Sequence, residues 1–313
     1  MQLNTKVCDL LNIQYPILQG GMAWIAGGRL AGAVSEAGGL GIIGSGNTPA
    51  SWLKEEIKVA RESTSKNFGV NLMLTSPYLE ENLQLTIEEK IPVVTTGGGN
   101  PGLYMKTFKE AGIKVIPVVA SVALARRLER LGADALIVEG AESGGHIGEM
   151  STMCLVPMVA DEVKIPIIAA GGIFDARGLV AALALGAQGV QIGTRFICTP
   201  EAKVHQAYQN KVIKAKDRST VICGQGTGHP VRAIQNNFSR EFIKAEKDGI
   251  GKEELQTLGK GRYPLAAVDG DVEQGSILAG QISALVKEIQ PSSEVVKEII
   301  QESKELLTKL GEF

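Results

Sequence analysis

The sequence predicts an α/β fold, a (β/α)8 or TIM barrel with a mainly helical insertion after its eighth strand. Three observations lead to this fold class. Eight short runs rich in apolar and β-branched residues recur through the first two thirds of the 313-residue chain, which is typical of parallel strands buried on both faces. Helix-patterned segments lie between them. One phrase also repeats, as "LGADALIVEG" at 131–140 and "LGAQGVQIGT" at 185–194. Eight consecutive βα units indicate the barrel.

The expected strands, in chain order, are 15–19, 40–44, 68–74, 92–97, 114–119, 135–140, 166–172 and 189–196. The segment 28–39, "GRLAGAVSEAGG", illustrates the helices between them. Leu30, Val34 and Ala37 fall there at helical spacing, and glycines follow as a stop signal.

The rhythm changes after Phe196. We expect barrel segments at 1–196 and 271–313 and a lid or substrate-binding insertion at 197–270, since insertions after barrel strands lie at the catalytic face. The insertion shows helical patterns at 201–216 and 239–249. The eighth outer helix is expected within 275–289. A final amphipathic helix is expected after Pro291, with an apolar side made of Val296, Ile299, Ile300, Leu306, Leu307 and Leu310.

An open, doubly wound sheet is the alternative fold, because a GxGxxG pattern occurs twice. "GLGIIG" at 39–44 follows a helix pattern and its apolar pair belongs to a strand. "GGGNPG" at 97–102 follows a strand but contains Pro101 and has no acidic residue about twenty positions later. Both contexts differ from that of a dinucleotide-binding loop, so turns after barrel strands explain the glycines better.

Composition narrows the class of protein. The hydrophobic content of 44% supports a large core, and the amino terminus shows no pattern of a signal peptide. The longest apolar run is too short to span a bilayer. Four cysteines lack metal-ligand spacing, and a net charge of −2 argues against nucleic acid as a partner. We therefore expect a soluble cytoplasmic protein without a bound metal centre.

Two loops at the end of the barrel sequence suit a phosphate group. In TIM barrels the loops after strands seven and eight commonly bind phosphate. Here Gly171, Gly172 and Gly193 can present backbone N–H groups, and Thr194 adds a hydroxyl donor. Tight strand-to-helix turns are the plainer explanation of these glycines.

Other strand ends offer groups suited to a flat heterocycle. Gly21 lets backbone approach a ring, and Met22 can lie against its face. Asn71 can both donate and accept hydrogen bonds, and Glu139 and Gln191 occupy the ends of two further strands. Each could be an ordinary buried polar residue. Their convergence on one barrel mouth indicates a phosphorylated aromatic cofactor.

The stretch "EGAESGGHIG" at 139–148 places His146 among glycines in the loop after the sixth strand. A histidine there can donate or accept a proton near neutral pH. The alternative is a loop histidine bonded to local backbone. We expect a surface or packing role for His205, whereas His229 fits loop structure and substrate contact equally well.

Several quoted segments resemble one enzyme family: "YPILQGGMAW", "FGVNLML", "EGAESGGHIG", "IPIIAAGGI", "QIGTRF", "GHPVRAI" and "GDVEQGSILAGQI". They are similar to the FMN-dependent enoyl-acyl-carrier-protein reductase II, within the nitronate monooxygenase (2-nitropropane dioxygenase-like) superfamily. The likeness covers almost the whole chain in order. The glycine-rich "CGQGTG" at 223–228 departs from the expected reductase pattern.

The resemblance implies that FMN binds at the barrel mouth, with catalysis by His146. It implies FMN contacts at Gly21, Met22, Asn71, Glu139, Gly171, Gly172, Gln191, Gly193 and Thr194. NADH or NADPH would be the electron donor, and a monovalent cation such as K+ or NH4+ activates some relatives. The acyl carrier protein would deliver a trans-2-enoyl substrate.

A charge count bears on this partner. Residues 200–262 contain twelve Lys or Arg and seven Asp or Glu, a balance of +5. A basic insertion suits an acidic carrier protein, although a solvated helical face explains the charges equally well. A homodimer is the default expectation for the assembly.

Two other functions remain open. A nitronate monooxygenase would oxidise alkyl nitronates with FMN and O2. A flavin-binding or phosphate-ligand sensor would show no turnover, but a roofed barrel mouth and a titratable residue within it favour an enzyme.

Overall fold

The barrel predicted from the sequence is present. In the computed structural model, which describes residues 3–312, eight parallel strands pair in the order β1-β9-β8-β6-β5-β4-β3-β2. A parallel bridge between Leu18 and Leu40 brings β1 beside the start of β2 and nearly closes the ring. The barrel strands are β1 (Ile17–Gln19), β2 (Ile42–Gly44), β3 (Gly69–Met73), β4 (Val93–Gly97), β5 (Lys114–Val119), β6 (Leu136–Glu139), β8 (Ile167–Ala170) and β9 (Val190–Ile192). Each lies within a predicted range, so the open-sheet alternative is wrong.

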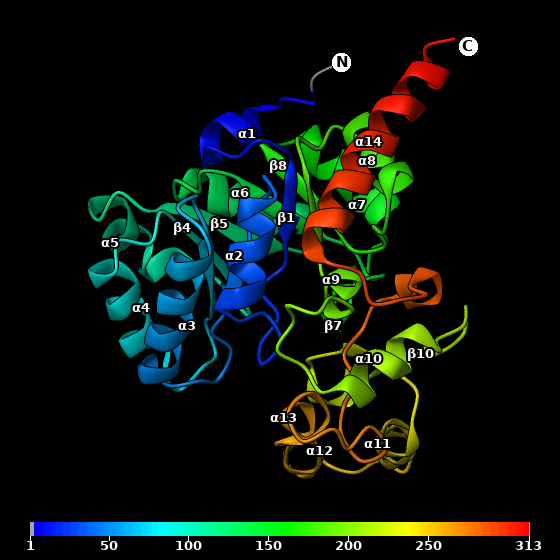
Figure 1. The fold of residues 1–313 in the computed structure, drawn as a ribbon. Coiled ribbons are helices and arrows are strands. Elements are labelled where there is room, and N and C mark those ends of the chain that lie inside the picture. The colour runs from blue at the N-terminus through cyan, green and yellow to red at the C-terminus, as the bar shows by residue number, and fades with distance from the viewer. Residues whose placement is uncertain (1–2, 313) are drawn as a thin grey trace.

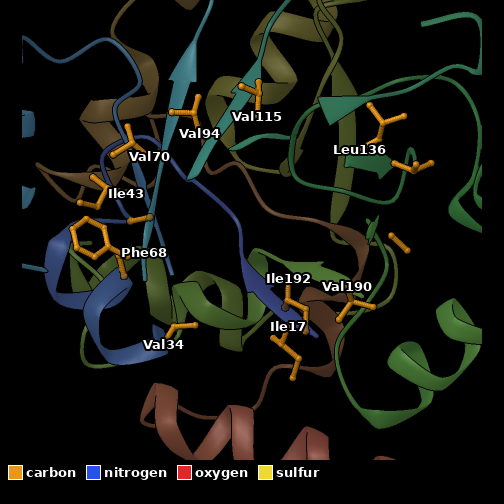
Figure 2. Packing of buried hydrophobic residues seen from close by; sticks show 14 of the residues in the cluster. Ile17, Val34, Ile43, Phe68, Val70, Val94, Val115, Leu136, Val190 and Ile192 are labelled. Carbon is orange, nitrogen blue, oxygen red and sulfur yellow. The ribbon is translucent and has the colours of Figure 1, made fainter. Parts of the chain in front are cut away.

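Helices surround these strands (Figure 1). Those between consecutive barrel strands are α2 (Gly28–Glu36), α3 (Ala50–Ser63), α4 (Leu79–Glu88), α5 (Met105–Glu110) with η1 (Pro101–Leu103), α6 (Val122–Arg130), α7 (Thr152–Ala160) and α8 (Ala176–Ala184). Figure 2 shows members of one buried cluster, among them Val70 and Val94 of the strands and Val34 of α2. This cluster lies in the layer between barrel and helices.

A second core fills the barrel itself. Leu18, Ile116, Ile137 and Ile168 form a buried cluster with Val7 and Leu11 of the first helix, α1 (Lys6–Leu11). Because the cluster also contains Leu40 and Ala135, which precede strands, α1 covers the amino ends of the strands. The carboxyl ends are left for the functional site.

The prediction for the eighth outer helix was wrong. Residues 275–289 contain only a 3₁₀ turn, η3 (Gln281–Leu285), and the final helix α14 (Ser292–Leu310) takes the outer position beside α8 and α2 (Figure 1). The peptide N–H of Ile234 donates to the carbonyl of Ile277, and Leu278 bridges to Ala233, so this segment is drawn onto the insertion. On α14, Val296, Ile299 and Ile300 are buried as expected, but Leu310 is 49% exposed.

The insertion is mainly helical, as predicted, and lies at the end of the molecule opposite both termini (Figure 1). It follows the short α9 (Thr194–Ile197) and contains α10 (Gln206–Ile213), α11 (Asn237–Lys247), α12 (Lys252–Gly259), α13 (Arg262–Ala267) and the turn η2 (Gln225–Thr227). It also contains a hairpin that the sequence did not reveal, β10 (Thr220–Cys223) and β11 (Val231–Ile234). Within residues 3–312, no helix combines the length and apolarity needed to span a bilayer.

Candidate active site

A cavity of about 1000 Å³ lies between the carboxyl ends of the barrel strands and the insertion. All of the residues predicted for the site line it, together with groups from the insertion. They are His146, Gly21, Met22, Asn71, Glu139, Gly171, Gly172, Gln191, Gly193 and Thr194. A cavity of this size can hold a cofactor and a substrate together.

The wall formed by β1, β3 and β9 is tightly packed around glycine backbone. A Cβ atom on Gly21 would lie 2.3 Å from the Cβ atom of Asn71, so only glycine fits there. The Asn71 amide donates to Thr95 Oγ1 at 2.9 Å, which fixes the side chain at the cavity edge. Gln191 lies against Gly20. Backbone and amide groups of this wall can therefore face a flat ring.

The two predicted phosphate loops meet at the same end of the cavity. Gly171 and Gly172 have φ values of 91° and 72°, left-handed conformations that favour glycine. Gly193 precedes α9, and the hydroxyl of Thr194 accepts a hydrogen bond from the Gly280 N–H at 2.9 Å. That hydroxyl keeps its own proton to donate, as a phosphate oxygen requires.

The insertion holds His146 at the cavity. Residues Gly145–His146 form a two-residue strand, β7, which pairs with β11 in an antiparallel three-stranded sheet with β10. His146 pairs with Val231, and the Ile147 N–H donates to the Pro230 carbonyl at 3.1 Å. The loop after β6 is thereby hydrogen-bonded to the β10–β11 hairpin, and the His146 ring is exposed to the cavity.

A second histidine stands beside the first. The ring centroids of His146 and His229 lie 6.4 Å apart, with the ring planes at 89°. Both rings line the cavity. Burial lowers the pKa of His146, and the neighbouring His229 imidazole lowers that pKa further. His205 has the surface role expected of it, because its Nδ1 accepts the Ala207 N–H and caps α10.

The end of β6 contributes an acid. Burial raises the pKa of Glu139 to about 7, so its carboxyl can hold or release a proton near neutral pH. The Ser143 hydroxyl lies beside this carboxyl and offsets part of the rise in its pKa. Both groups line the cavity, where they can contact a polar ligand atom.

Sequence reasoning missed several cavity residues. Glu142 accepts hydrogen bonds from the Thr152 N–H and Oγ1, both at 2.9 Å, and braces the loop that carries His146. Leu278 and Gly280 line the cavity because the segment predicted as an outer helix crosses its mouth. The repeated small residues of "GSILAGQ" were a usable signal, since glycine permits close backbone approach.

A TIM barrel with a glycine-rich cavity at its carboxyl face and a titratable histidine defines a cofactor-dependent barrel enzyme. A family model described as nitronate monooxygenase matches residues 4–302, and the chain belongs to this family. The family implies an FMN flavoprotein, an oxidoreductase.

Individual relatives differ in their stated activities. The structure of FabK from Thermotoga maritima is similar with a TM-score of 0.95 and 50% identity over 98% of both chains. A (3aS,4S,5R,7aS)-5-hydroxy-7a-methyl-1-oxo-octahydro-1H-indene-4-carboxyl-CoA dehydrogenase of Mycobacterium tuberculosis is 33% identical, covering 96% of both chains. A probable nitronate monooxygenase of Staphylococcus saprophyticus is 32% identical over 99% of this chain and all of the relative.

The cavity fits FMN on its own observations. The two loops offer N–H groups and the Thr194 hydroxyl to a phosphate, while Gly21, Met22, Asn71 and Gln191 border space for a ring. The Ser143 hydroxyl also lines the cavity and adds a polar group. Within residues 3–312 no cluster of three or more His, Cys, Asp or Glu could hold a metal ion.

Proposed function

We propose that the chain is an NAD(P)H-dependent enoyl-acyl-carrier-protein reductase acting through bound FMN. It would convert a trans-2-enoyl thioester into the saturated acyl thioester in fatty acid synthesis. The single observation that carries this proposal is the likeness to FabK, an enoyl-acyl-carrier-protein reductase II, at 50% identity over 98% of both chains.

The residues that line the cavity support a place for the cofactor. Gly171, Gly172, Gly193 and Thr194 would hold the phosphate, and the β1, β3 and β9 wall would border the ring. FMN held by these residues would supply the hydride chemistry that links the nicotinamide to the enoyl β-carbon. The protein's own contribution is to bind, orient and polarise the substrate.

His146 is the proposed catalytic residue. Hydride addition at the β-carbon moves electron density onto the α-carbon and the thioester oxygen, so a proton must arrive at the α-carbon. From its fixed position on β7, His146 can give that proton or donate a hydrogen bond to the developing enolate oxygen. Burial lowers the pKa of His146, so the ring is mostly neutral near neutral pH. The N–H of a neutral imidazole can still donate the hydrogen bond to the enolate oxygen.

The acyl carrier protein is the proposed macromolecular partner, and the insertion is the side on which it would dock. Lys211 is engaged with Glu273 at 2.5 Å, whereas Lys214 and Lys216 are exposed. These two lysines are therefore the better candidates to meet an acidic partner.

Three further properties belong to the proposal. We propose a homodimer in the cytoplasm, activated by a monovalent cation. Replacing Na+ with K+ or NH4+ should raise the turnover rate of the reductase, and gel filtration with light scattering should give twice the 33.1 kDa of one chain.

Product analysis tests the main proposal. Anaerobic incubation with NADH or NADPH and a trans-2-enoyl thioester should give one saturated thioester per nicotinamide oxidised, identified by mass spectrometry. The rival is nitronate oxidation, supported by the likeness to a probable nitronate monooxygenase. Oxygen consumption with an alkyl nitronate, combined with no thioester reduction, would establish that rival.

A further inference from the structure

The cavity has an apolar compartment on its insertion side. Cys223 of β10, Phe238 and Phe242 of α11, and Leu255 of α12 form a buried cluster of their own. The same four residues line the cavity that contains His146. This cluster, here called the lid cluster, is therefore both a small core of the insertion and a wall of the active site.

The chemistry of the lid cluster is that of a hydrocarbon surface. The Phe238 and Phe242 rings meet edge to face, with centroids 5.7 Å apart. Burial raises the pKa of the Cys223 thiol to about 11, so the group stays protonated and behaves as a small apolar side chain. The carbonyls of Leu258 and Gln274 accept hydrogen bonds from Arg262, the cation that stacks on Phe238.

Gly259 has no side chain to fill the part of the cavity beside the lid cluster. Gly259, the last residue of α12, lines the cavity, and a Cβ atom built on it would contact Phe242 Cε2 at 3.5 Å. A larger side chain at 259 would therefore begin in contact with the Phe242 ring. Leu255, Gln256 and Gly259 lie on one face of α12, and this face borders the cavity.

We propose that the lid cluster binds the hydrocarbon tail of the acyl thioester and that Gly259 and Phe242 determine the chain length accepted. This inference rests on the proposed function. Moving a methylene of the tail from water onto such a surface is favourable, so each one strengthens binding. The polar parts of cofactor and substrate instead match the glycine loops, Glu139 and His146 on the barrel side.

The test compares Gly259→Val with a matched control, Gly251→Val. Gly251 precedes α12 in an extended conformation, does not line the cavity, and would meet no atom within 4 Å if it carried a Cβ. The measured quantity is the ratio of kcat/KM for a twelve-carbon trans-2-enoyl thioester to that for a four-carbon one. We expect Gly259→Val to lower this ratio at least tenfold and Gly251→Val to leave it unchanged.

A second variant protects the test against trivial misfolding. Adding Phe242→Leu to Gly259→Val removes the ring edge that the new side chain would contact, so the ratio should recover. An unchanged ratio in Gly259→Val, or equal losses for both substrates that Phe242→Leu fails to restore, would overturn the proposal.

A binding measurement separates this inference from the proposed function. Calorimetry of the holoenzyme with saturated twelve-carbon and four-carbon acyl-CoA should show tighter binding of the longer chain, and Gly259→Val should reduce that preference tenfold. The preference could survive even if the protein reduced no enoyl thioester, in which case only the proposed function would fail. Equal affinity for both chain lengths would show that the lid cluster does not bind the hydrocarbon tail.

Discussion

At the scale of single residues, the site depends on how two histidines and one glutamate share a low-dielectric cavity. The His146 and His229 rings lie 6.4 Å apart at their centroids, close enough for one charge to affect the other. Glu139 faces the same cavity from the end of β6. The pKa of His146 therefore depends on His229, whereas that of Glu139 is set mainly by burial.

Replacing His229 with glutamine should raise the pKa of His146. The substitution removes a neighbouring group that can carry positive charge, while burial continues to hold the pKa below its ordinary value. NMR titration of the histidine rings would show the displacement to higher pH. His205→Asn is the control, since asparagine can still cap α10 and lies outside the cavity. A His146 titration that stayed in place in His229→Gln would show that the two rings do not interact.

Glu139 should make stability depend on pH. Its pKa of about 7 in the folded protein exceeds the ordinary value of 4.5, so the folded state binds this proton more tightly. The free energy of unfolding should therefore fall as pH rises from about 4.5 to 7. Because the side chain borders the cavity, we expect a loss of about 1–3 kcal/mol.

Urea unfolding of the apoprotein at several pH values would measure this effect. The difference in unfolding free energy between wild type and Glu139→Gln isolates the one carboxyl. As pH rises from about 4.5 to 7, the unfolding free energy of wild type should fall relative to that of the glutamine variant. A difference that is constant from pH 4.5 to 7 would mean that the Glu139 carboxyl is not perturbed.

At the scale of elements, the β10–β11 hairpin of the insertion and the barrel loop that contains β7 form one structural unit. β7 pairs with β11, so His146 is positioned by a segment more than eighty residues away in sequence. The buried Arg232 reinforces the junction, because its Nε donates to the Ala141 carbonyl at 2.9 Å and its Nη1 to Thr220 Oγ1 at 3.2 Å.

Arg232→Lys should loosen this junction. A lysine ammonium cannot reproduce the planar fork that reaches both acceptors, and a lost hydrogen bond to a charged group costs about 1.5–3 kcal/mol. We expect amide hydrogen exchange at 145–147 and 231–234 to accelerate about tenfold to a hundredfold. Amides of β3 to β5 should be unaffected, and the exposed Arg240→Lys should change nothing. Uniform acceleration throughout the chain would instead indicate global destabilisation.

Charge reversal on the insertion tests carrier docking. In the Lys214→Glu/Lys216→Glu variant, KM for an enoyl group on the carrier protein should rise about fivefold to twentyfold at low salt, and less at high salt. KM for the same enoyl group on coenzyme A should change little. The control reverses two exposed lysines, Lys297 and Lys304, on α14, which runs away from the insertion towards the carboxyl terminus (Figure 1). Equal effects of both pairs would place the carrier elsewhere.

At the scale of the whole molecule, the barrel was predictable and the insertion only in part. Strands buried on both faces carry continuous apolar runs, so ranges such as 68–74 contain β3. Barrel topology then brings their carboxyl ends together, which is why Asn71, Glu139 and Gln191 could be grouped without coordinates.

The features of the insertion that the sequence did not predict were missed for physical reasons. The strands Thr220–Cys223 and Val231–Ile234 are short, and their pairing with β7 is a long-range contact that local pattern does not encode. The apolar residues of 275–289 have helical spacing, but the segment gains hydrogen bonds to the hairpin instead. The lid cluster was missed because Phe238, Phe242 and Leu255 look like ordinary core positions of two helices.

A stopped-flow experiment tests the central claim, that reducing equivalents pass from a nicotinamide through the bound flavin to an enoyl thioester with His146 assisting. The anaerobic holoenzyme is mixed first with NADH and then with a trans-2-enoyl thioester, while the flavin absorbance is followed. Wild type should show rapid bleaching and then thioester-dependent recovery. His146→Ala should keep the first phase and slow the second about 100- to 10,000-fold. Absorbance that NADH does not bleach, or that an enoyl thioester does not restore, would contradict the account.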